Sequence, residues 1–129
     1  MTHQNSIDYF HNFGFEPPKG YQWLLEQRIV GFSPFSALQP WYYLEGDQIF
    51  KVNERWPKGS YNGALVAFAR RQDNDYIACF HVEKGDIKAV VIINGWTGSG
   101  YDVLQSYDSF WVWLKSVVDD IAEWVENSV

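Results

Sequence analysis

Cys79 and His81 are the residues whose types and spacing come nearest to a catalytic pair. They alternate along a run of strand-forming residues, so their side chains point to the same face of the strand. A nucleophilic cysteine needs a base within hydrogen-bond distance and an electropositive, partly exposed setting, whereas Cys79 lies mid-strand between apolar neighbours. A structural zinc needs four ligands, and the other two histidines lie in a separate N-terminal segment. We therefore expect an inert thiol, no metal site and no cofactor.

Two pairs of carboxylates and one glycine-rich loop are the remaining candidates for chemistry. Asp73 with Asp75, and Glu45 with Asp47, have the donor types for acid–base work or calcium binding. Each pair, however, brackets an Asn or a Gly in a tight turn, where Asp is common for backbone reasons. The loop Gly95–Gly100 follows a strand but contains neither the dinucleotide-binding pattern nor the P-loop pattern. These features predict turns and an exposed loop, so we expect no enzyme activity.

Three consecutive strand-length segments form the centre of the expected fold. They are apolar and rich in β-branched or aromatic residues, and they occupy Gly63–Arg70, Asp75–Val82 and Ile87–Asn94. Short polar turns join them, which predicts an antiparallel meander. Trp41–Leu44 and Gln48–Asn53 flank a turn that contains glycine, so they predict a hairpin and a sheet of five strands or more.

Helices are expected towards both ends of the chain. Ile7–Phe13, with Ser6 as its cap, and Tyr21–Val30 predict two short N-terminal helices. After Asp108, which can cap a first turn, apolar residues recur at helical spacing. This stripe consists of Phe110, Trp113, Leu114, Val117, Ile121, Trp124 and Val125. A C-terminal amphipathic helix should therefore cover the sheet.

Length and composition favour one domain over residues 1–129, and the expected strands and helices make it an α+β domain. We expect a mixed, largely antiparallel sheet of five or six strands, with short N-terminal helices and a closing C-terminal helix. At 129 residues and 47% hydrophobic, the chain has ample material for one core. No apolar run approaches the roughly 20 residues that a membrane span needs, and the N-terminus lacks the features of a signal peptide. With a single cysteine, these features favour a soluble, cytoplasmic protein.

Charge and aromatic content point to a binding surface. The formal net charge of −6 argues against a nucleic-acid partner. After Gly100 the chain contains six acidic residues and one lysine, which indicates either a solvated helix face or a surface for a basic partner. Tyr and Trp side chains outside the core stripe could anchor such a surface or stack on sugars. These aromatic residues are Trp41, Tyr42, Tyr43, Trp56, Tyr61, Trp96 and Tyr101.

The order of these segments resembles the SUKH (Smi-Knr) superfamily. In that family an apolar strand, a polar turn with Asp and a hydrophobic strand precede the later strands, and a Ser-Phe pair opens the terminal helix. The corresponding residues are Leu65–Ala69, Asp73 and Asp75, Ile77–Val82, the branched strand to Ile93, and Asp108-Ser109-Phe110 before the helix Trp111–Trp124. Pro18–Val30 is similar to the family's early helical segment, and Leu38–Trp41 is similar to its approach to the first strands.

The resemblance implies an α+β domain with helices packed on a mixed sheet. For bacterial members it also implies an immunity protein that binds and neutralises a cognate polymorphic toxin, often a nuclease or a nucleic-acid deaminase, and it implies no catalysis. Such a toxin is basic at its active site, so the acidic C-terminal region would complement it. The partner-binding residues predicted on this basis are Trp56, Trp96, Tyr101, Asp102, Asp119, Asp120, Glu123 and Glu126.

Two other functions remain open from the sequence. The first is a non-catalytic ligand-binding or protein-binding module, which in one version binds a glycan by stacking on Trp41, Trp56 and Trp96. The second is an enzyme that acts through Asp73 and Asp75. A toxin-like reading frame next to the gene would favour the immunity protein over both.

Overall fold

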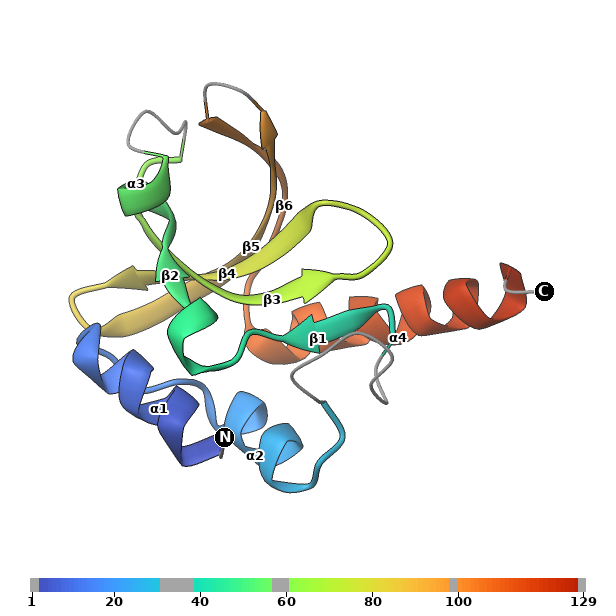
Figure 1. Cartoon of the computed structure of the whole chain (residues 1–129), viewed down its shortest axis with the longest axis horizontal. Coiled ribbons are helices and arrows are strands. Elements are labelled where there is room, and N and C mark those ends of the chain that lie inside the picture. The colour runs from blue at the N-terminus through green and yellow to red at the C-terminus, as the bar shows by residue number, and fades with distance from the viewer. Residues whose placement is uncertain (1–2, 31–38, 57–60, 98–99, 128–129) are drawn as a thin grey trace.

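A computed structural model describes residues 3–30, 39–56, 61–97 and 100–127, with the backbone alone for residues 3–5, 96 and 97. The α+β fold is confirmed: two short N-terminal helices and a long C-terminal helix accompany a six-stranded sheet. Figure 1 shows α1, α2 and α4 on one side of the sheet. The helices are α1 (His3–Asn12), α2 (Lys19–Glu26), α3 (Val52–Arg55) and α4 (Phe110–Asn127), with a short 3-10 turn, η1 (Gly46–Gln48). The strands are β1 (Trp41–Tyr43), β2 (Phe50–Lys51), β3 (Ala64–Arg71), β4 (Tyr76–Glu83), β5 (Asp86–Thr97) and β6 (Gly100–Tyr107).

The central meander is confirmed as β3, β4 and β5. The strand order is β1-β3-β4-β5-β6, with β2 also paired to β3, and every pairing among the described residues is antiparallel. Lys84 and Gly85 join β4 to β5 with φ angles of 51° and 82°, as a tight two-residue hairpin turn requires. In the preceding turn, the Asn74 Oδ1 atom accepts a hydrogen bond of 2.9 Å from the Tyr76 N–H group. The turn residues therefore fix this part of the fold locally.

The predicted hairpin between residues 41 and 53 is wrong. β1 and β2 do not pair with each other, because both pair with β3: Tyr43 lies opposite Ala69, and Phe50 lies opposite Ala67. They are two halves of one edge strand that η1 interrupts. Within η1, the N–H of Glu45 donates to the Gln48 side chain at 3.1 Å, so the interruption has its own capping bonds.

The predicted loop Gly95–Gly100 is also wrong, because β5 continues to Thr97 and β6 begins at Gly100. β6 was not predicted from the sequence. It is the edge strand of the sheet, and most of its side chains after Tyr101 are exposed, so it lacks a strong apolar alternation. Register shifts between β5 and β6 accompany the curvature of this hairpin in Figure 1.

Three helix boundaries differ from the sequence expectation. Ser6 does not cap α1; it is buried inside the helix, where its Oγ atom accepts a 3.2 Å bond from the Gly46 N–H group. α2 ends at Glu26, because Arg28 takes a left-handed conformation with φ of 58°. At the start of α4, Ser109 rather than Asp108 accepts the N–H of Val112, at 3.2 Å. The tertiary contact of Ser6, the backbone turn at Arg28 and the cap at Ser109 each set a boundary that residue types alone did not show.

An aromatic cluster joins the helices to the sheet. The rings of Phe68 on β3 and Phe80 on β4 stack with centroids 3.9 Å apart. Tyr21 of α2 contacts both rings, at 5.9 Å from each, and Trp113 of α4 lies 5.1 Å from Phe68.

No helix in the described ranges is long and apolar enough to cross a lipid bilayer.

Candidate partner-binding surface

The apolar stripe of α4 extends beyond the part of the helix that the sheet covers. Phe110, Trp113 and Val117 are buried, and Leu114 and Ile121 are half-buried. Along the outer edge, apolar side chains remain exposed: Trp111 by 52%, Val118 by 57% and Val125 by 61%. Val125 was expected to face the sheet, so that part of the prediction is wrong. The reason is geometric: α4 runs past the strands at its C-terminal end, as Figure 1 shows.

Trp111, Val118 and Val125 form what we call the exposed apolar row. Residues seven apart in an α-helix lie two turns apart on almost the same side, so the row runs about 21 Å along the helix. Asp119 and Glu126 each follow a member of the row, and both side chains are exposed. Carboxylates therefore flank the row along its C-terminal half.

The predicted acidic residues of α4 divide into two groups. Asp119, Glu123 and Glu126 are exposed, as a binding surface requires. Asp120 instead accepts a hydrogen bond of 2.9 Å from the Trp41 indole N–H and lies 3.6 Å from Arg71 Nη1. Asp120 therefore holds β1 and β3 against α4. Its contact to Arg71 was not predictable, because the two residues lie far apart in the sequence.

Arg71 on β3 contacts two carboxylates, those of Asp73 and Asp120. Burial by itself would lower the pKa of the Arg71 guanidinium, but Asp73 and Asp120 outweigh it and raise that pKa. Asp73 accepts two hydrogen bonds from Arg71, from Nε at 2.8 Å and from Nη2 at 2.9 Å. The Asp73 carboxylate is thus occupied in a turn, which favours the structural interpretation of the Asp73–Asp75 pair.

Trp56 and Tyr101 do not lie on the surface that α4 forms. Tyr101 is only 4% exposed, and its hydroxyl accepts the Tyr61 N–H at 3.2 Å. The half-buried Trp56 ring lies 6.1 Å from the Tyr101 ring and so close to Gly95 that an added Cβ there would be 2.6 Å from Trp56 Cη2. Figure 1 places α3, which Trp56 follows directly, well away from α4. Both aromatic residues therefore support the curved β5–β6 hairpin.

The two other predicted residues lie on that hairpin. Asp102 is exposed on β6. The side chain of Trp96 lies outside the described residues, so its contribution stays a prediction. Of the predicted residues whose side chains are described, Trp56, Tyr101 and Asp102 lie at the hairpin, and the four acids lie on α4, in another part of the fold (Figure 1).

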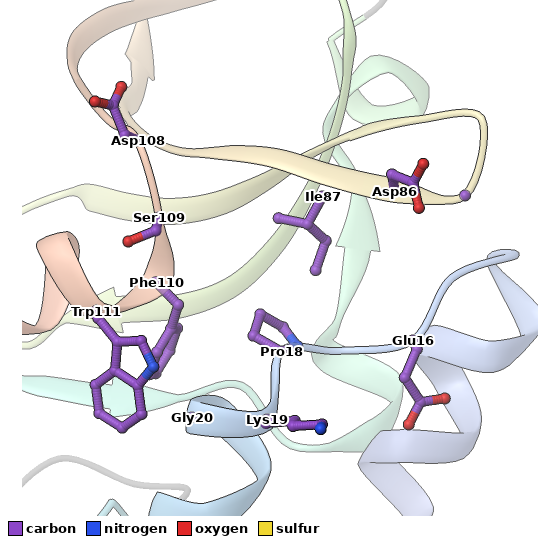
Figure 2. Close-up of a pocket in the computed structure, with 11 residues that line it drawn as sticks. Glu16, Pro18, Lys19, Gly20, Asp86, Ile87, Asp108, Ser109, Phe110 and Trp111 are labelled. Carbon is purple, nitrogen blue, oxygen red and sulfur yellow. The ribbon is translucent and has the colours of Figure 1, made fainter.

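A pocket of about 380 Å³ lies at the N-terminal end of α4, where no sequence pattern indicated one. Three segments meet there: the link between α1 and α2, the turn between β4 and β5, and the start of α4. Figure 2 shows Trp111 and Phe110 on one side of the pocket and Asp86 and Glu16 on another. Pro18 and Ile87 supply apolar lining, and Lys19 supplies one positive charge.

Cys79 and His81, the candidate catalytic pair, are held by packing and by hydrogen bonding within the fold. Cys79 is fully buried, and burial raises the pKa of its thiol far above the usual range. His81 Nδ1 lies 2.9 Å from the Tyr61 hydroxyl. Within the described parts of the chain, His, Cys, Asp and Glu form no cluster of three or more that could hold a metal ion.

No family model, no curated protein and no solved structure matches this chain. The molecule is therefore characterised by its own geometry. It is an α+β domain whose long C-terminal helix presents apolar side chains beside carboxylates, with a pocket at the start of that helix.

Proposed function

We propose that this protein is an immunity protein of the SUKH type that binds and neutralises a cognate toxin. The observation that carries the proposal is the exposed apolar row of α4 beside Asp119 and Glu126. An exposed large apolar patch rimmed by polar residues is typical of a protein interface. The helix that presents it is anchored to the sheet by the contacts of Trp113 and Phe110 with Phe68, so the surface is preorganised for binding.

The charge of this surface supports a basic partner. A toxin that cuts or deaminates nucleic acid in the cytoplasm carries Lys and Arg where it holds the phosphate backbone. Carboxylates on α4 would attract that surface, raise the association rate and select against acidic proteins. The proposal therefore assigns the protein a non-catalytic, cytoplasmic role as an inhibitor.

The competing functions fit less well. Trp41 is only 3% exposed and donates its indole N–H to Asp120, so it is not available to stack on a sugar. The glycan-binding version would then depend on Trp56, which is half-buried against Tyr101, and on Trp96. An enzyme acting through Asp73 would have to release that carboxylate from Arg71.

The test is a calorimetric titration of the protein into the toxin-like domain that the adjacent gene encodes. We expect one-to-one binding and loss of the domain's activity on nucleic acid at stoichiometric ratio. A basic toxin domain from an unrelated gene pair is the matched control, and it should remain active. If the cognate domain releases no heat and keeps its full activity, the immunity function is wrong.

A further inference from the structure

We propose that the exposed apolar row of α4 is the docking site for a basic amphipathic helix of the partner. One Lys or Arg side chain near the end of that helix enters the adjacent pocket. This inference deepens the proposed function, because it names the kind of element that the toxin would present. It rests on three observations: the spacing of the row, the charges beside it and the position of the pocket at its N-terminal end.

The spacing of the row fits a second helix. Trp111, Val118 and Val125 recur every seven residues, and the half-buried Leu114 and Ile121 lie between them on the sheet side. Apolar residues that alternate three and four positions apart form the seam along which two α-helices pack. The sheet already covers the inner edge of α4, so the seam has its outer half exposed. A second helix packed along the row would bury it.

Trp111 is a preorganised anchor for such a helix. Gly20 of α2 lies directly against it, because a Cβ atom on Gly20 would sit 2.9 Å from Trp111 Cζ2 and 2.8 Å from Phe110 Cδ2. One edge of the indole is therefore packed while about half of the side chain stays exposed. A large aromatic side chain that is held in place before binding loses little conformational entropy when it becomes buried.

The charges around the row favour a basic occupant over a second copy of this chain. Asp119 and Glu126 flank the C-terminal half of the row, and the exposed Lys115 lies beside its N-terminal half. The pocket at that end contains Glu16, Asp86 and Asp108 against Lys19, so carboxylates outnumber basic groups around the row and the pocket. A second copy would bring the same carboxylates against one another, and like charges across an interface disfavour the complex. Lys or Arg residues on a partner helix would instead pair with carboxylates at both ends.

The pocket fits one long basic side chain. Trp111 belongs both to the row and to the pocket wall, so the two are continuous. The aliphatic stem of a Lys or Arg would lie along Trp111 and Ile87, and its charged end would reach Asp86 or Asp108. An arginine would also stack on the exposed indole. This arrangement orients the partner helix with its basic residue towards the N-terminus of α4.

The test uses two synthetic helical peptides of about the length of α4, with leucines at heptad spacing and either lysines or glutamates beside them. Fluorescence anisotropy of the labelled peptides measures binding to the full chain. We expect the lysine peptide to bind and the glutamate peptide not to bind. Val118→Asp should weaken the lysine peptide at least tenfold. Val112→Asp is the matched control: it adds the same charge at another exposed valine, about 120° round the helix, and should not weaken binding.

The Val118→Asp variant separates apolar docking from charge alone. If charge alone held the peptide, the added carboxylate would tighten binding, and that result would overturn the inference. Equal weakening by both valine variants would also overturn it. The double variant Asp86→Asn, Asp108→Asn should weaken binding of the lysine peptide several-fold. If its affinity for the peptide is unchanged, the pocket is not part of the docking site. If the chain dimerises as its concentration rises and Val118→Asp abolishes the dimer, the occupant of the row is a second copy of the chain and the inference is overturned. The toxin titration fails or succeeds independently of these peptides.

Discussion

Replacing Trp113 with alanine should lower the free energy of unfolding by about 3 to 5 kcal/mol, because it removes a large side chain from the contact between α4 and the sheet. Trp113 is 2% exposed, and its ring lies 5.1 Å from Phe68, 5.5 Å from Phe110 and 5.5 Å from Trp41. No small rearrangement of α4 would fill the space that the indole leaves. Urea denaturation followed by circular dichroism measures the change.

Trp111→Ala is the matched control, two residues away on the same helix. Because the Trp111 side chain is half exposed and packs along one edge only, its loss should lower the free energy of unfolding by about 1 to 2 kcal/mol, clearly less than the loss of Trp113. Equal destabilisation by the two variants would mean that the buried and exposed sides of α4 have been wrongly assigned. The comparison also shows whether Trp111 can be changed in binding experiments without unfolding the domain.

Reversing the exposed acids of α4 should slow association with the cognate toxin by about tenfold or more at low salt. The variant carries Asp119→Lys, Glu123→Lys and Glu126→Lys. Asp120 is left unchanged, because it accepts the Trp41 indole N–H and pairs with Arg71. The association rate should also become less sensitive to salt, since long-range attraction between exposed charges is what salt screens. Surface-plasmon kinetics at two salt concentrations measures both effects.

A second triple variant controls for net charge. Glu26→Lys, Glu54→Lys and Asp75→Lys produce the same change in charge at exposed positions on α2, α3 and the β3–β4 turn. If the binding surface is on α4, this variant should keep most of the wild-type association rate. Equal slowing by both triple variants would show that overall charge governs the encounter and that α4 has no special part in it.

The features that were predictable from sequence are those fixed by local patterns. The β4–β5 turn contains Lys84-Gly85, and α4 carries apolar residues at helical spacing, so each pattern has one main structural outcome. The edge of the sheet was not predictable in the same way. β1 and β2 look like a hairpin from residue types, but which strand they join depends on β3, which lies further along the chain. β6 carries many polar residues because it forms the other edge.

The candidate site was predicted only in part for a related reason. Exposure of Asp119, Glu123 and Glu126 follows from the helical period once the apolar stripe is known. The burial of Tyr101 and the internal role of Asp120 depend on contacts across the fold, with Tyr61 and with Trp41. The pocket beside Trp111 combines three segments that are far apart in sequence, so no local pattern indicates it.

The most direct test of the immunity function is survival of cells that express the adjacent toxin domain. Co-expression of the wild-type chain should restore growth, the Glu26, Glu54 and Asp75 variant should protect to nearly the same extent, and the variant with reversed α4 acids should protect poorly. Immunoblotting of the three proteins controls for their levels. If cells die equally with and without the wild-type chain at a verified excess over the toxin, the central claim is contradicted.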